Sequence, residues 1–228
     1  MTTPRLDPSS GSVILAIDSA TTRVVVAAGT FDGAVTEAVD WPAGYRHGES
    51  LLPAVDALLT RLGIEPARIA AVVVGTGPGA FTGLRVGIAM AKGLAHALGR
   101  PIIGISTADA LLADAPEGAV LLLPAGPSDR LVIRRGAPAA LVRAGSDAGI
   151  ATDAPLLAVD LEGRAPADAL ELGEAARARL GASLIAIGAA RLAAGEVDDL
   201  ARLVPEYVTL PRGVGAEVGE VLWSRDRR

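Results

Sequence analysis

The sequence predicts an α/β fold in which two lobes, each built on a mixed β-sheet, are flanked by helices. Half of the 228 residues are hydrophobic, which is enough for a substantial core in one or two domains. Three short β-branched runs come first and predict antiparallel strands, because only short turns separate them. Apolar strands then alternate with amphipathic helices, which is typical of parallel βαβ units. Antiparallel and parallel strands in one lobe make a mixed sheet.

The first lobe is expected to span residues 13–115, after a flexible leader of residues 1–12 that is rich in Pro, Ser and Gly. Strands are predicted at 13–18 (VILAID), 23–29 (RVVVAAG) and 33–40 (GAVTEAVD). The apolar residues then change to helical spacing and Gly63 follows as a stop, which predicts a helix over 49–62. Its broad apolar stripe consists of Leu51, Leu52, Val55, Leu58, Leu59 and Leu62.

A βαβ unit completes this lobe. Residues 69–75 (IAAVVVG) form a continuous apolar run, as expected for a strand buried on both faces. The Gly-rich turn GTGPGAFTG leads into a helix from about Phe81 to Leu98, which Gly99 ends, and a strand follows at 101–105. Three meander strands, a helix, a strand, a helix and a further strand resemble the order of an actin-like lobe. A plain Rossmann domain would begin with alternating strands and helices.

The second half is expected to form a smaller, degenerate lobe over residues 116–228, with the boundary at the breaks around Pro116 and Pro124. Strands are predicted at 119–123, 130–135 and 155–160. Ala-rich segments at 166–180 and 182–195 predict helices. No repeat of fixed period is visible in the sequence.

Composition excludes several kinds of function. The 26 acidic and 21 basic side chains give a net charge of −5. This argues against the chain binding nucleic acid without a partner, because phosphate neutralisation needs a positive surface. Without cysteine there is no disulfide, thiol nucleophile or Cys-ligated zinc, and two histidines leave little for a multi-His metal site. The polar leader lacks a signal-peptide core and no apolar stretch reaches the roughly 18 residues of a membrane span. A cytoplasmic protein without membrane contact is therefore expected.

The Gly-rich turn is the sharpest local motif. Gly75 to Ala80 match G-x-G-x-x-A between a strand and a helix, so Thr76, Gly77 and Gly79 are weak candidates for holding a phosphate. Against this, Pro78 has no NH group, no acidic residue closes the next strand to hold a ribose, and no Lys-Ser/Thr pair follows. The alternative is a tight turn that needs several positive φ angles.

Three polar side chains have two readings each. Asp18, which ends the first strand, could contact a phosphate or orient a metal-bound water, or it could form a turn with the Ser and Thr residues that follow. His47 precedes a helix and could be a base, or simply mark the helix entry. His96 is expected to pack or to lie exposed on its helix.

The helix at 81–98 carries small residues every four positions, at Gly83, Gly87, Ala91 and Ala95, with Leu84 beside them. Such a row lets another helix approach closely. That helix could belong to the chain's own core or to a partner subunit, and the Leu stripe at 49–62 has the same two readings.

Longer stretches resemble the TsaB (YeaZ) family. The similarity rests on ILAIDSATTRVVVA, RHGESLLPAVDALL, GTGPGAFTGLRVGIAMAKGLAHALGRPIIGIST and a late Pro205-Glu206-Tyr207-Val208. It covers residues 13–112, and its most specific part is GPGAFTGLRVG from Gly77 to Gly87. The resemblance implies an actin/Hsp70-like (ASKHA, RNase H-like) two-lobe fold and a relationship to the catalytic paralogue TsaD.

The family also implies a role. It pairs with TsaD through helices of the first lobe, and the small P-loop ATPase TsaE joins the pair. Together they transfer threonylcarbamoyl to N6 of adenosine 37 in tRNAs that read ANN codons. The implied interface comprises the residues of the Leu stripe and of the small-residue row named above. Alone, the same surface would form a homodimer, and tRNA would be bound only through the complex.

The catalytic paralogue carries two histidine metal ligands in a His-x-x-x-His motif, and the resemblance places Thr107 and Leu111 at these positions. No catalytic or metal-binding residue is therefore expected, and ATP and a metal are implied only for the partner subunits. The chain departs from its family at 124–136, where Pro124-Ala125-Gly126-Pro127 replaces an Asp-Ala-Arg-Arg-like stretch.

Two other functions remain open from the sequence. An autonomous ASKHA-type ATPase or phosphotransferase would need phosphate-binding motifs in both lobes, and the second half shows no convincing adenosine loop. A glycoprotease-like peptidase would need metal ligands or a nucleophile-base pair, and Ser106 and His47 have no visible link.

Overall fold

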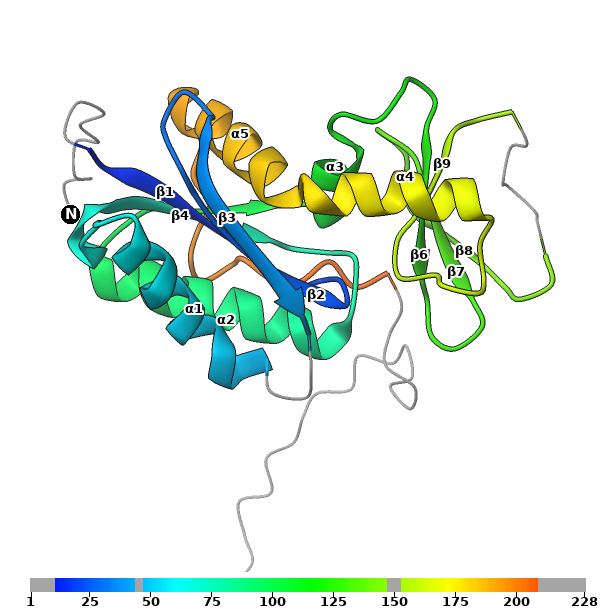
Figure 1. Ribbon diagram of the computed structural model, residues 1–228, viewed down its shortest axis with the longest axis horizontal. Coiled ribbons are helices and arrows are strands. Elements are labelled where there is room, and N and C mark those ends of the chain that lie inside the picture. Colours follow the sequence, from blue (N-terminus) through cyan, green and yellow to red (C-terminus); the bar gives the residue numbers. More distant parts are fainter. Residues whose placement is uncertain (1–10, 44–46, 147–152, 209–228) are drawn as a thin grey trace, which may run out of the picture.

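The computed structural model describes residues 11–43, 47–146 and 153–208, which form two sheets (Figure 1). The first sheet has the order β3-β2-β1-β4-β5. Its strands are β1 Val13–Asp18, β2 Arg23–Gly29, β3 Val35–Pro42, β4 Ile69–Gly75 and β5 Ile102–Ile105. β2 pairs antiparallel with both β1 and β3, whereas β4 pairs parallel with both β1 and β5. The predicted meander and the mixed sheet are therefore confirmed.

Helices cover both faces of this sheet, with α1 His47–Arg61 and α2 Phe81–Leu98 on one side and α5 Leu180–Ala193 on the other (Figure 1). Alternate residues of β1 point to opposite faces, as the pleat requires. Val13, Leu15 and Ile17 pack in one cluster with α1 and α2, while Ile14 and Ala16 pack with α5. Every residue of β1 and β4 is buried, which explains their continuous apolar sequences.

The second sheet has the order β8-β7-β6-β9. Its strands are β6 Val120–Pro124, β7 Arg130–Ile133, β8 Ala140–Val142 and β9 Leu156–Ala158, and α4 Ala167–Ala178 packs on it. The chain also has two short helices, α3 Thr107–Leu112 and the 3₁₀ helix η2 Pro66–Arg68. The apolar cluster on the α5 side of the first sheet continues through α3 into the second sheet, so the lobes share one core.

The expected division of the chain at residue 116 needs a correction. The second sheet begins after this point, but α5 returns to the first sheet and residues 198–208 follow it there. Residues 116–228 are therefore not one contiguous lobe. The apolar face of α5 is buried against β1, β2 and β4, because that surface of the first sheet has no other cover.

Most predicted elements appear within two residues of their expected bounds, and the two-lobe α/β fold is confirmed. β3 starts later than predicted because residues 30–34 form a tight turn, in which Thr30 N donates to Ala34 O at 2.9 Å and Gly33 has a φ of 89°. The short elements α3 and β8 were not predicted, since three to six residues carry little periodicity. No helix in the described ranges is long and apolar enough to cross a bilayer.

Candidate functional site

The Gly-rich turn joins β4 to α2 beside the end of β1, and three of its NH groups are bonded within the chain. Thr76 N donates to Ile105 O at 2.8 Å, Gly77 N to Thr107 Oγ1 at 3.1 Å, and Ala80 N to Ala20 O at 2.7 Å. Pro78 has no NH group to offer. Three of the NH groups that a phosphate cradle would use are therefore already satisfied, which favours the structural reading of this turn.

The glycines of this turn serve mainly close packing. Gly77 has a φ of 103°, and it is the one residue between 75 and 80 in the left-handed region, so the expectation of several positive φ angles is wrong. A Cβ on Gly79 would lie 2.2 Å from Ala20 O, and a Cβ on Gly75 would lie 1.7 Å from Asp18 Oδ2. Side chains are excluded because neighbouring segments touch the turn directly.

Asp18 is fully buried under this turn. Its Oδ1 accepts a hydrogen bond from Ala20 N at 2.8 Å, which is the predicted turn, and its Oδ2 accepts one from Thr107 Oγ1 at 2.6 Å. Burial raises the pKa of Asp18 to about 6, although the bonds from Thr107 and Ala20 act in the opposite direction. With no exposed surface, the carboxyl cannot reach a ligand and instead ties β1 to α3.

A cavity of about 670 Å³ lies between the two lobes, which is within the usual range for ligand pockets. The atypical segment 124–127 forms part of one wall, and the aromatic rings of Phe81 and Tyr207, 5.2 Å apart, form part of another. The charged side chains that line it are acidic: Asp129, Asp160 and Glu206. Because no described Lys or Arg lines this cavity, its lining offers no positive side chain to bind a nucleotide phosphate.

We name residues 198–208 the strap, because this segment runs along β5 and across the Gly-rich turn. Asp198 pairs with Ile102, Leu203 packs on Gly104, and Glu206 N donates to Thr76 O at 2.8 Å. Thr76 Oγ1 in turn donates to Glu206 Oε1 at 3.0 Å. Desolvation raises the pKa of Glu206, and nearby Asp109 adds to the effect. The strap thus packs on the start of the turn at Thr76 and Gly77, while Gly79 and Ala80 remain exposed and line the inter-lobe cavity.

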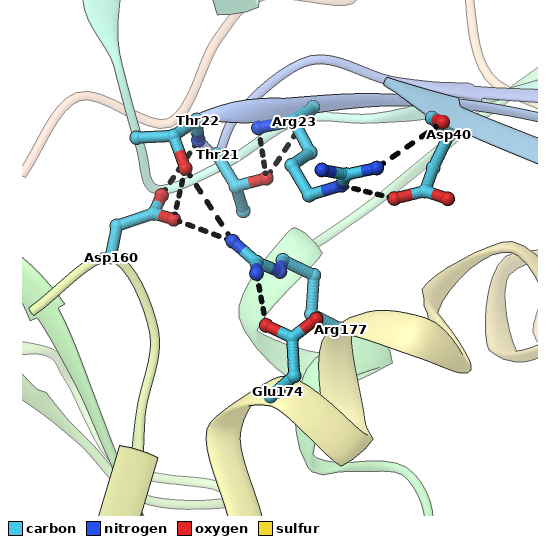
Figure 2. Close-up of polar contacts among 7 residues, drawn as sticks. All are labelled: Thr21, Thr22, Arg23, Asp40, Asp160, Glu174 and Arg177. Carbon is cyan, nitrogen blue, oxygen red and sulfur yellow. Dashed lines mark hydrogen bonds and ion pairs between the residues drawn. The ribbon is translucent and has the colours of Figure 1, made fainter. Parts of the chain in front are cut away.

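Asp160, two residues after β9, joins the second lobe to the first (Figure 2). It accepts hydrogen bonds from Thr22 N at 2.7 Å and from the Thr22 hydroxyl, and Arg177 Nη1 of α4 lies 3.1 Å away. Arg177 also pairs with Glu174. Sequence reasoning missed this cluster, because Thr22 and Asp160 lie 138 residues apart and no local pattern links them.

The residues expected to form a partner surface lie mostly inside the chain's own core. Leu52 is 47% exposed and Leu62 is partly buried. The expectation is wrong for the other members, which are buried against the first sheet, against Ser19 (the two glycines) or against Gly77 (Leu84): Leu51, Val55, Leu58, Leu59, Gly83, Leu84, Gly87, Ala91 and Ala95. Their side chains are unavailable to a partner in the folded chain.

The outer face of α2 carries a second row of small residues, which is available to a partner where the first row is buried. Ala89, Gly93 and Ala97 are exposed at the same spacing of four, and a Cβ on Gly93 would meet nothing within 4 Å. His96 is also exposed there, whereas His47 begins α1 and its side chain lies outside the described residues. The sequence contained the signal for this row, but nothing in it said which row faces the sheet.

Metal ligands are also scarce. Within the described ranges, no three His, Asp or Glu side chains lie close enough to hold a metal ion. Thr107 and Leu111 are buried in α3, and the Thr107 hydroxyl lies between Asp18 and Gly77 N.

Comparisons with known proteins bear on this arrangement. Residues 41–136 match the family model of TsaD, tRNA N6-adenosine threonylcarbamoyltransferase. The tRNA threonylcarbamoyladenosine biosynthesis protein TsaB of Escherichia coli is 43% identical over 94 residues, which cover 41% of this chain and 40% of that protein. The TsaB protein of Bacillus subtilis is 34% identical over 101 residues, 44% of each chain. The matched region thus spans less than half the length of these curated relatives.

Similarity of fold extends further than similarity of sequence. The structure of YeaZ from Pseudomonas aeruginosa aligns with a TM-score of 0.64 and 22% identity, and the alignment covers 86% of this chain and all of that one. The two-lobe fold is therefore shared along almost the whole described chain, while the sequence match is concentrated in the first lobe. These similarities, in sequence over the first lobe and in fold over most of the chain, are to proteins of the TsaB (YeaZ) family.

Proposed function

We propose that the chain is a non-catalytic, activating subunit in the synthesis of threonylcarbamoyladenosine in tRNA. Relatives named TsaB, tRNA threonylcarbamoyladenosine biosynthesis proteins, support the pathway. The observation that carries the non-catalytic role is the position of Thr107 and the bonding of its hydroxyl. It stands at one of the two metal-ligand positions of the paralogous transferase, and its hydroxyl is engaged by Asp18 and Gly77. The second position holds Leu111, which has no ligand atom.

The chemistry of the buried network supports the same role. A transferase site needs groups that reach the substrate, but Asp18 has no exposed surface and lies directly beneath the Gly-rich turn. The inter-lobe cavity offers carboxylates and aromatic rings, with no cation from the described residues to meet a phosphate. Activation would therefore act through contact with a catalytic partner that resembles TsaD.

The outer face of α1 and α2 is the proposed partner surface. Leu52 on α1 and Ala89, Gly93 and Ala97 on α2 are exposed, and the two helices pack side by side (Figure 1). Small residues at a spacing of four allow a facing helix to approach closely, and an exposed Leu adds apolar area to bury. TsaE and tRNA would join through this pair, and two copies of the chain would use the same face when the partner is absent.

The test is pairing with the TsaD-type paralogue of the same organism, measured by size-exclusion chromatography and titration. Gly93→Leu should abolish pairing while the chain stays folded, because the added side chain projects into open space in the free subunit. Ala178→Leu, at an exposed position of α4, is the matched control and should pair normally. A wild-type chain that does not pair, or a Gly93→Leu variant that does, would overturn the proposal.

The two alternative activities have direct assays. An autonomous ATPase or phosphotransferase would hydrolyse or transfer nucleotide phosphate in the purified chain, and a peptidase would cleave a peptide library. Neither activity is expected, since Asp18 is enclosed and Leu111 offers no ligand atom. Turnover that persists through rigorous purification and disappears on Asp18→Ala would support an enzyme instead.

A further inference from the structure

The turn of residues 19–22 contacts three parts of the molecule at once. It connects β1 to β2 at the edge of the inter-lobe cavity. Thr22 bonds to the second lobe, Ala20 bonds to the Gly-rich turn, and Ser19 bonds to α2. A single four-residue turn therefore links the lobe contact to the helix that carries the proposed partner surface.

The lobe contact is buried: Thr22 of the first lobe donates to the Asp160 carboxylate of the second, and Asp160 pairs with Arg177 of its own lobe. We name Thr22, Asp160 and Arg177 the latch. The side chains of Asp160 and Arg177 are 5% and 12% exposed, so water screens their attraction little (Figure 2). Asp160 holds a left-handed φ of 58°, which is uncommon for a residue other than glycine. Loss of Arg177 would leave the buried Asp160 carboxylate without a charged partner, whereas loss of Asp160 would leave Arg177 paired only with Glu174. The latch therefore favours one arrangement of the two lobes.

The turn of residues 19–22 packs tightly against α2. Ser19 Oγ donates to Gly83 O at 2.8 Å. A Cβ on Gly83 would lie 2.1 Å from Ser19 O, and one on Gly87 would lie 2.2 Å from Ser19 Oγ. Ala20 O accepts the NH of Ala80, directly before α2. Because close-packed contacts transmit displacements, the turn cannot shift without moving the first turns of α2.

We infer that the turn of residues 19–22 couples the latch to α2, so that a closed latch and binding of the TsaD-type partner stabilise each other. This inference rests on the proposed function, because it takes the outer face of α2 as the partner surface. Coupling between two sites is reciprocal. A closed latch strengthens partner binding, and the bound partner shifts the equilibrium between the open and the closed latch by the same factor.

The latch is tested in the isolated chain by the distance between two spin labels. The chain has no cysteine, so cysteines introduced at exposed Glu65 in the first lobe and Arg143 in the second are labelled selectively. Asp160→Asn keeps the side-chain shape and tolerates the left-handed φ, but it removes the charge. The wild-type labels should give one narrow distance distribution and Asp160→Asn a broad one. A distribution that stays narrow in Asp160→Asn would overturn the latch.

Two further variants make this result specific. Asp40→Asn is the matched control, since it removes an exposed ion pair with Arg23 beside the same turn and within one lobe (Figure 2). Its distribution should stay narrow. Thr22→Val removes the hydroxyl donor but keeps the bond from Thr22 N, so its distribution should be intermediate. Circular dichroism verifies that each variant is folded, and Thr22→Val supplies the answer if Asp160→Asn unfolds.

Coupling is tested by titrating the unlabelled chains with the paralogue. Asp160→Asn should weaken binding about fivefold or more, the range of ordinary allosteric coupling, and Asp40→Asn should not change it. Saturating partner should also narrow the broad distribution of the labelled Asp160→Asn chain. Unchanged affinity beside a broadened distribution would overturn the coupling. If the wild-type chain does not bind the paralogue, the proposed function and the coupling both fail, while the spin-label distances still decide the latch.

Discussion

Replacement of Asp18 by Asn should stabilise the protein near neutral pH and flatten the pH dependence of its stability. Burial raises the pKa of Asp18 from 3.8 to about 6, against the opposing effect of hydrogen bonds from Thr107 and Ala20. The unfolded chain exposes the same carboxyl and restores its ordinary pKa. Between about pH 4 and 6, the folded state therefore holds a proton that the unfolded state has lost. Stability contributed by this group is complete below the unfolded pKa and falls as the pH rises through the folded pKa.

The size of the effect follows from the two pKa values. A rise from 3.8 to about 6 corresponds to about 3 kcal/mol of unfolding free energy lost between about pH 4 and 7. Solvent screening does not reduce this figure, because the side chain has no exposed surface. In a chain of this length, the loss lowers the melting temperature by about 6–12 °C. Asn keeps an acceptor for Ala20 N and supplies an NH₂ donor to the Thr107 oxygen, without the charge.

Denaturant unfolding of wild type and Asp18→Asn across about pH 4 to 7.5 measures the difference directly. The free energy of unfolding of the wild type should fall relative to that of the variant as the pH rises. Glu206 also has a raised pKa, but it is present in both proteins and cancels in the comparison. Parallel profiles for the two proteins, or a wild type that gains on the variant with rising pH, would refute the reasoning.

Three other outcomes are expected. Gly87→Leu should lower the free energy of unfolding by about 1–3 kcal/mol or more, because its Cβ would lie 2.2 Å from Ser19 Oγ. Gly93→Leu, whose side chain meets open space, should melt no lower than wild type. Equal melting temperatures for the two variants would contradict the assigned burial. Gly104→Val should displace the strap, since a Cβ there would lie 2.4 Å from one of its side chains, and limited proteolysis should then cut the strap faster. The isolated chain, with a net charge of −5, should bind tRNA only weakly and in a salt-dependent way, and a tight, saturable titration near physiological salt would argue otherwise.

The sequence by itself determined the elements of the first lobe and the resemblance to TsaB proteins. Strand β4 and helix α2 were predictable from their own residues, because an apolar run bounded by glycine and a small-residue helix with a Gly99 stop are local signals. The turn of Asp18 was likewise among the predicted alternatives, since an Asp followed by Ser and Thr bonds to its own backbone. Short elements such as α3 and β8 escaped because too few residues repeat in them.

Only the tertiary structure decided which side of each helix is buried and which distant residues meet. On α2, Gly87 and Gly93 belong to two rows with the same spacing, and the turn at Ser19 fixes the row of Gly87 against the core. The return of α5 to the first sheet was equally undetermined, because an apolar helix fits any uncovered sheet face. Thr22 and Asp160 meet across 138 residues of chain, and no local pattern records that contact. Local periodicity fixes elements, whereas long-range packing assigns their faces and partners.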